Sequence, residues 1–177
     1  AYHNVYVKLQ DVIAEASNQT WSNYFNSNLK NKIGMTGTWI QTGDFSVYWS
    51  TTRSMARFGL LTYAGGIWET EQIIPVNYLD VAVNTSQSIN QAYGYMWWLN
   101  GKSTYHLPQS QFEFPGELIP NAPSDMYAAL GKNDQKIYVV PSQDLVVIRM
   151  GDAAEGENFT LSSFDNELWA KINALIN

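Results

Sequence analysis

Two apolar runs joined by a short polar turn constrain this chain more than any other feature. Residues 137–140 (IYVV) and 145–148 (LVVI) are apolar or β-branched throughout and have the length of strands. Residues 141–144 (PSQD) between them predict a tight turn, because proline presets φ and the serine and aspartate side chains can bond nearby backbone. Neither run alternates with polar residues, so both faces of the predicted hairpin need cover, which helices elsewhere in the chain are expected to supply.

Charge and composition exclude several classes of partner. The chain has 177 residues, a net charge of −6 and only ten Lys and Arg residues, which are scattered along it, so no basic surface for nucleic acid is expected. No apolar run approaches the roughly 20 residues of a membrane-spanning helix. The absence of cysteine excludes disulfides, thiol catalysis and thiolate metal sites, but leaves the compartment open.

Helical periodicity dominates the first half of the chain. Apolar residues lie on one face of a helix that begins near Val5, and similar patterns predict helices at 20–33, 50–64 and 75–83. A last helix is expected from Ser163, which can cap it. The stripe expected on the first helix is Val5, Leu9, Val12, Ile13 and Ala16. The stripe expected to be buried on the last helix is Phe164, Leu168, Ile172, Leu175 and Ile176.

Strand signals are concentrated in the second half. Residues 93–99 (YGYMWWL) predict a strand, whereas 35–48 is expected to be mostly loop and 102–124, with four prolines, an irregular excursion. The predicted fold class is therefore α+β, an antiparallel sheet flanked by helices, with residues 1–90 mainly helical and 91–177 holding the sheet strands and the C-terminal helix. Three or four strands are few for a helix-flanked sheet, which suggests that part of the fold lies outside this sequence.

Residues that could carry chemistry are few when each is taken alone. His3 and His106 are too far apart for a metal motif, so no metal site is expected, and no Gly-x-Ser-x-Gly, Ser-x-x-Lys or phosphate-binding loop is present. Tyr2 beside Asn4 could form a proton-transfer pair, although its local sequence favours a terminal tyrosine packed on the surface. Residues 97 and 98, both tryptophan, favour core packing over a binding platform.

Several motifs can be read together in chain order: 2–4 (YHN), 33–39 (IGMTGTW), 48–61 (YWSTTRSMARFGLL), 65–68 (GGIW), 72–75 (QIIP), 93–98 (YGYMWW) and the hairpin at 137–148. Together they resemble the serine β-lactamase and penicillin-binding protein family, and most of all its class C β-lactamase-like esterases and amidases. Residues 2–4 look like the family's Tyr-x-Asn element. The resemblance runs along the whole chain but covers only the C-terminal portion of such an enzyme. It implies an incomplete β-lactamase/transpeptidase-like fold, without the N-terminal helix, some strands and the helix that carries Ser-x-x-Lys.

The resemblance implies an acyl-enzyme mechanism on a small ester or amide, with no cofactor. The nucleophile would be the serine of a Ser-x-x-Lys motif upstream of this chain, so the missing N-terminal portion is an expected partner and this chain alone is expected to be inactive. Tyr2 would relay a proton with the absent lysine, because a phenol of reference pKa about 10 needs a neighbouring cation for that role. Asn4 would position the substrate and the lysine through its amide.

The family's third motif, Lys-Thr-Gly or His-x-Gly, falls by position on Ala129, Leu130 and Gly131. The backbone N–H of Leu130 would be one of two oxyanion donors, and Gly131 would let the strand approach the substrate. Lys132 and Asn133 would line the rim, with a solvated turn as the equal alternative. Ala129 lacks the family's basic side chain, which argues against binding of a β-lactam or peptide carboxylate. The Ala-Leu-Gly form looks more like the esterase and nylon-oligomer-type amidase branches.

Two alternatives to an enzyme remain open at this point. A non-catalytic binding module that keeps the penicillin-recognition fold would account for the lost basic residue at Ala129. A stand-alone structural domain would need its helices to bury their stripes on a sheet of three or four strands. The resemblance favours a periplasmic or secreted protein, although no export signal follows Ala1.

Overall fold

The structure, a computed structural model, describes residues 5–154, 156 and 160–176. The α-helices are α1 (Val5–Ser17), α2 (Trp21–Phe25), α3 (Thr52–Tyr63), α4 (Val76–Ala82) and α5 (Ser163–Ile176), and short π or 3-10 turns are η1 (Asn26–Lys30), η2 (Lys132–Asp134) and η3 (Pro141–Gln143). The strands are β1 (Gly37–Thr42), β2 (Phe45–Ser50), β3 (Ile67–Trp68), β4 (Glu71–Gln72), β5 (Trp98–Leu99), β6 (Thr104–His106), β7 (Glu113–Pro115), β8 (Tyr127–Gly131), β9 (Gln135–Val140) and β10 (Leu145–Arg149). The α+β class predicted from the sequence is confirmed.

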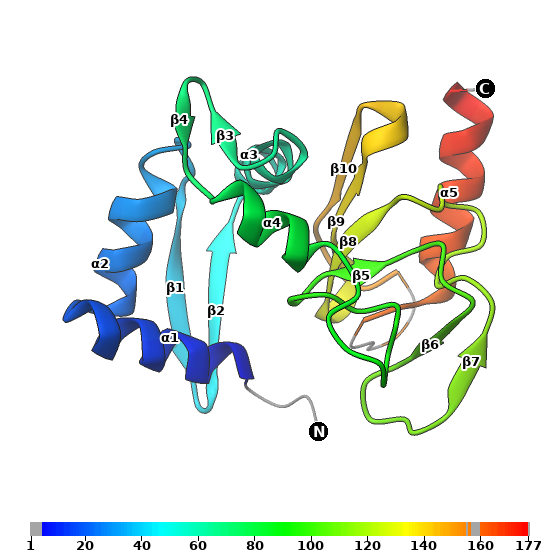
Figure 1. Ribbon diagram of the computed structural model, residues 1–177, viewed down its shortest axis with the longest axis horizontal. Coiled ribbons are helices and arrows are strands. Elements are labelled where there is room, and N and C mark those ends of the chain that lie inside the picture. Colours follow the sequence, from blue (N-terminus) through cyan, green and yellow to red (C-terminus); the bar gives the residue numbers. More distant parts are fainter. Residues whose placement is uncertain (1–4, 155, 157–159, 177) are drawn as a thin grey trace.

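One antiparallel sheet of four strands organises the second half of the chain, in the order β10-β9-β8-β5 (Figure 1). The predicted hairpin is present as β9 and β10, with Leu145 opposite Val140. Its turn is η3, closed by Asp144 in the left-handed region at φ 50°, which aspartate tolerates better than most residues. Residues 127–131, which include the three residues assigned to the family's third motif, form the third strand of the sheet, β8.

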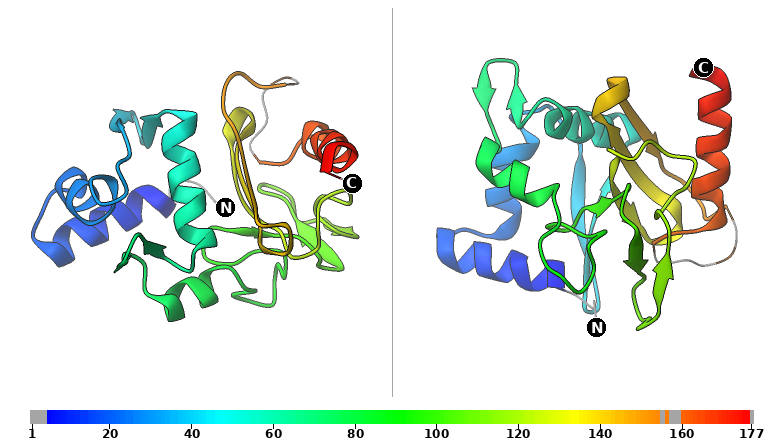
Figure 2. Two further views of the ribbon diagram at one scale, coloured as in Figure 1. Left: turned by 90° about the horizontal axis from the view of Figure 1, so that it is seen from above. Right: turned by 45° about the vertical axis from the view of Figure 1, so that its right-hand side comes forward.

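Both faces of this hairpin are covered by helices, as its unbroken apolar runs predict. Figures 1 and 2 show α3 on one side of the sheet and α5 on the other. On the α3 side Gly59 allows close contact, because a Cβ there would lie 2.6 Å from Val146 Cγ1. On the α5 side Trp169 is fully buried and packs edge-on against Tyr138, with ring centroids 5.6 Å apart. The sheet is therefore the middle layer of three.

Two strand predictions were wrong in opposite directions. Residues 35–48 were expected to be mostly loop but hold the β1–β2 hairpin, with Ile40 opposite Val47. The predicted strand at 93–99 keeps only β5 and a bridge between Tyr93 and Trp98. A tight turn interrupts it: Met96 has φ 64°, and the N–H of Gly94 donates to the carbonyl of Trp97 at 2.8 Å. Trp97 and Trp98 are both buried in the core, as expected.

Two helices leave part of their apolar stripes exposed. On α5 the fully buried side chains are Asp165 and Trp169, and of the expected stripe Leu168 and Ile172 pack partly buried against the core, while Leu175 is 85% exposed. On α1 the apolar residues Val5, Leu9 and Val12 are exposed, and the one buried residue is Gln10. None of the helices described is both long and apolar enough to cross a bilayer.

Candidate functional site

The edge of β8 is open at the position where the sequence places the third motif. β5 pairs with Tyr127 and Ala128 and then ends, so no described strand continues the ladder opposite Ala129, Leu130 and Gly131. On its other side β8 pairs with β9 along its whole length, as far as Gly131. The last three residues of β8 therefore present one free backbone edge.

The direction of the Leu130 amide follows from the ladder. Asn100 N–H donates to the carbonyl of Met126 at 2.9 Å, so this carbonyl points toward β5, whereas the N–H of Met126 donates to Pro123 in the preceding turn. Backbone direction alternates along an antiparallel strand, so the N–H and carbonyl groups of Ala128 and then Leu130 point to the β5 side as well. Because β5 has ended by that point, the N–H of Leu130 faces the open edge, while its side chain is buried in the core on the α5 side.

The turn after this edge has an unusual backbone. Asn133 and Asp134 both have positive φ, 56° and 59°, values that asparagine and aspartate tolerate better than most residues. Of the predicted rim residues, Lys132 is exposed, and the side-chain oxygen of Asn133 is buried with no hydrogen-bond partner among the described residues. The structure thus brings Leu130 and both rim residues to one end of the sheet.

Two of the predicted catalytic residues, Tyr2 and Asn4, lie outside the described residues. The first described residue is Val5, where α1 begins. In Figure 1 this end of α1 points toward the side of the molecule that holds the four-stranded sheet. The placement of Tyr2 and Asn4 relative to Leu130 therefore stays a prediction.

A buried ionic network lies on the next strand, directly opposite Leu130. The side chain of Lys136 is fully buried, and its ammonium lies 3.2 Å from Asp134 Oδ1 and 3.1 Å from Asp165 Oδ2. It also donates to the carbonyl of Thr160. All three ammonium protons therefore have acceptors, which favours a structural role for this lysine over a catalytic one.

The network ties the start of α5 to the sheet. Asp165 Oδ2 accepts from the backbone N–H of Ser162 at 2.8 Å, as the third residue of a capping box does. Its other oxygen accepts the hydroxyl of Tyr138 at 2.5 Å. Burial raises the pKa of Tyr138, and the charge of Asp165 acts in the same direction. The tyrosine is thus held as a neutral donor.

Sequence reasoning missed this network, although a signal was present. Lys136, Tyr138 and Val140 alternate along β9 and so share the face that α5 covers. A lysine at the start of such a buried face needs a carboxylate partner, and Asp165 in the first turn of the following helix was available.

Comparisons with known proteins bear on the fold. No protein-family model matches the sequence, and no curated protein matches it either. Among solved structures, one from Bacillus anthracis, named "Putative 6-aminohexanoate-dimer hydrolase", superposes on 99% of this chain with a TM-score of 0.65 and 21% identity. A second, named "putative beta-lactamase" and from Bacteroides dorei DSM 17855, superposes on 94% with a TM-score of 0.59 and 12% identity. The chain has the β-lactamase/transpeptidase-like fold.

This chain represents only part of that fold as the two neighbours have it. It spans 43% of the first neighbour and 54% of the second, about half of each. The prediction of an incomplete β-lactamase/transpeptidase-like fold, made from the motifs, agrees with this coverage. At identities of 12–21% the likeness establishes the fold and leaves the chemistry to the residues of the site.

Proposed function

We propose that this chain is the C-terminal portion of a serine hydrolase that acts on a small ester or amide through an acyl-enzyme. The observation that carries the proposal is the open edge of β8, where the N–H of Leu130 faces outward next to a turn with positive φ. Within the β-lactamase/transpeptidase-like fold, such an edge can hold the carbonyl group under attack.

The proposed mechanism assigns each group one task. The serine of an upstream Ser-x-x-Lys attacks the carbonyl carbon, and the carbonyl electron pair moves to the oxygen, which Leu130 N–H and the serine's own amide stabilise. Tyr2, paired with the absent lysine, takes the serine proton and passes it to the leaving group as the tetrahedral species collapses. Water then attacks the acyl carbon, and Tyr2 with the lysine takes the proton of the water and passes it to the serine oxygen as the acyl bond breaks. Asn4 orients the substrate.

Ala129 bears on the choice of substrate. Its side chain is half-buried against the cluster that includes Met55 and Phe58, so it offers no cation to a substrate carboxylate. This favours a neutral ester or amide over a β-lactam, with Gly131, Lys132 and Asn133 lining its binding site. The Bacillus anthracis neighbour is named for hydrolysis of a 6-aminohexanoate dimer, which supports an amide bond as the target but not a neutral substrate, because that dimer also carries a carboxylate.

The proposal is tested by labelling the full-length protein with a fluorophosphonate probe. The expected adduct maps to the serine of a Ser-x-x-Lys motif upstream of residue 1. Tyr2→Phe is expected to slow p-nitrophenyl acetate hydrolysis by roughly 10²- to 10⁴-fold, the usual contribution of a general acid–base. Tyr6→Phe, at the next tyrosine along the chain, is the matched control and should change the rate little. If neither an adduct nor hydrolysis is found, the proposal that the full-length protein is a serine hydrolase is wrong.

We propose further that the missing N-terminal portion covers two apolar surfaces of this chain. One is the α1 stripe, where Val5, Leu9 and Val12 are 47%, 44% and 61% exposed. The other is the outer face of the β1–β2 hairpin, formed by Ile40, Phe45, Val47 and Trp49. Exposed apolar patches of this kind mark interaction sites, and about half of each structural neighbour lies outside this chain.

This covering surface has its own test in the full-length protein. Val12→Glu is expected to lower the free energy of unfolding by about 1–3 kcal/mol, because it buries an unpaired charge under the N-terminal portion. Leu175→Glu, at a side chain that is 85% exposed near the end of α5, is the control and should have little effect. Equal, small effects of both changes in thermal unfolding would show that α1 stays uncovered.

The second candidate is a non-catalytic binding module of the same fold, favoured by the loss of a basic residue at Ala129. It predicts that an ester or amide binds the full-length protein without turnover and that no Ser-x-x-Lys precedes this chain. The upstream reading frame and the fluorophosphonate experiment together distinguish the two.

A further inference from the structure

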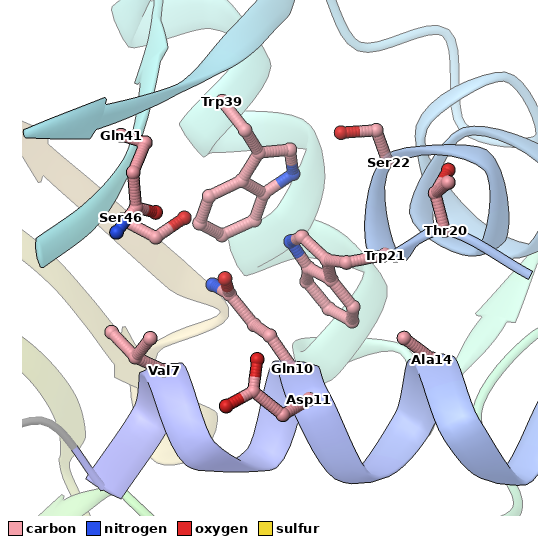
Figure 3. Close-up of a pocket in the computed structure, with 10 residues that line it drawn as sticks. All are labelled: Val7, Gln10, Asp11, Ala14, Thr20, Trp21, Ser22, Trp39, Gln41 and Ser46. Atoms are coloured by element: carbon pink, nitrogen blue, oxygen red, sulfur yellow. The ribbon is translucent and has the colours of Figure 1, made fainter. Parts of the chain in front are cut away.

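A cavity of about 460 Å³ lies between α1, α2 and the β1–β2 hairpin (Figure 3). Its volume is within the range of small-molecule sites. The α1 side contributes the face opposite the exposed apolar stripe, and the hairpin contributes its inner face. The lining residues used below are Gln10, Asp11, Trp21, Trp39, Gln41 and Ser46.

Two indole N–H groups in this cavity have no acceptor. Trp21 Nε1 and Trp39 Nε1 are both buried, and neither has a hydrogen-bond partner among the residues that the structure describes. The two rings meet edge to face with centroids 5.2 Å apart, and Figure 3 shows their nitrogens turned toward each other. Burial of two adjacent donors without an acceptor is unfavourable, so an oxygen atom that accepts from both nitrogens would stabilise the pair. Trp169 Nε1 is also unpaired, but it is on α5 and is not among the residues that line this cavity.

The remaining lining selects the chemistry of the ligand. Figure 3 shows the Gln10 amide rising from α1 toward the indoles, and Gln10 is only 8% exposed. Amide and hydroxyl groups such as those of Gln41 and Ser46 can both donate and accept. The one charged side chain in the lining is Asp11, which pairs with Lys8 at 3.1 Å, so an anion would meet a carboxylate rather than a cation. The cavity therefore suits an uncharged molecule whose groups both donate and accept.

We propose that this cavity binds a small uncharged polyol, of which a monosaccharide is the simplest example. One ligand oxygen accepts both indole N–H groups, and its other hydroxyls bond to Gln10, Asp11 and Ser46. The apolar faces of the two indoles provide a surface for the carbon skeleton. The same chemistry would recognise a free sugar or the terminal sugar of a glycan. This proposal stands independently of the serine hydrolase, because it uses none of the residues assigned to catalysis.

The test is a titration of the full-length, ¹⁵N-labelled protein, followed by NMR through its tryptophan indole N–H signals. Trp21→Phe and Trp39→Phe identify the two signals. Glucose is expected to shift both in a saturable way, and a methyl glycoside, which mimics a glycan terminus, distinguishes the two sources. Trp39→Phe is expected to weaken glucose binding by about 2- to 10-fold, as loss of one hydrogen bond does. Trp68→Phe, at a half-buried residue of β3 that is not among the residues lining this cavity, is the matched control and should leave affinity unchanged.

Three outcomes would overturn the proposal. The first is that neither the Trp21 signal nor the Trp39 signal shifts when a sugar is added up to its solubility limit. The second is a non-saturating shift shared with Trp68, which would be a general solvent effect and would leave a bound water as the only acceptor. The third is tighter binding of acetate or choline than of glucose. The wild-type titration alone decides between these results if a tryptophan variant fails to fold.

Discussion

Lys136→Met is expected to lower the free energy of unfolding by about 3–5 kcal/mol, the cost of removing one partner from a buried ionic network. The change leaves the carboxylates of Asp134 and Asp165 buried beside each other without their cation. It also releases the carbonyl of Thr160 in the segment before α5. Urea unfolding followed by circular dichroism measures the loss.

The control for this change is Lys8→Met. Lys8 pairs with Asp11 at a similar distance, 3.1 Å, but both side chains are largely exposed, and exposed pairs contribute about 0–1 kcal/mol. A second control adds Asp165→Asn to Lys136→Met, which removes one unpaired charge and should recover part of the loss. A loss below about 1 kcal/mol for Lys136→Met would contradict the assigned role of the network.

On the proposed mechanism, removal of the Leu130 N–H is expected to lower kcat of the full-length protein by roughly 10²- to 10³-fold, the effect of deleting one oxyanion donor. The cleanest change replaces Leu130 with its α-hydroxy acid, which turns the N–H into an ester oxygen and keeps the buried side chain. Since this N–H faces the open edge rather than β9, the ladder keeps its pairing. Ester hydrolysis at saturating substrate measures the change.

The same replacement at Ala129 is the matched control. The backbone groups of Ala129 point toward β9, opposite Ile137, so this change removes a ladder hydrogen bond. It is expected to lower stability while leaving kcat per folded molecule close to that of the wild type. Equal losses of kcat at the two positions would show that Leu130 N–H has no special role.

The sequence alone predicts those elements whose pattern is strong over a long stretch. The unbroken runs at 137–140 and 145–148 predict both the hairpin and its cover by helices, and the structure confirms both. Capping and proline signals likewise place α2 after Thr20 and α4 after Pro75. In each case a local preference agrees with the tertiary fold.

Local patterns failed where long-range contacts decide the outcome. The β1–β2 hairpin was missed because its residues are mixed: one face carries Trp39 and Tyr48 inward, while Ile40 and Val47 on the other face are exposed. The α1 stripe was identified, but its local pattern does not show that Val5, Leu9 and Val12 are exposed in this chain. The pairing of Lys136 with Asp165 spans 29 residues, so helix or strand periodicity, which relates residues a few positions apart, does not predict which carboxylate pairs with the lysine.

The candidate site was predictable only in part, for a similar reason. The sequence placed Leu130 and the turn at Lys132 and Asn133 by resemblance to a family. Whether the Leu130 N–H faces an open edge depends on where β5 begins, and the turn that precedes β5 has no strong sequence signal apart from Gly94. Tyr2 and Asn4 remain predictions.

The most direct test of the central claim is a crystal structure of the full-length protein with the fluorophosphonate bound. The proposal predicts a phosphonyl group on the upstream serine, with its oxygen about 2.7–3.1 Å from the backbone nitrogen of Leu130 and the Tyr2 hydroxyl beside the serine oxygen. An adduct whose oxygen points away from β8, or Tyr2 and Leu130 on opposite sides of the molecule, would contradict it.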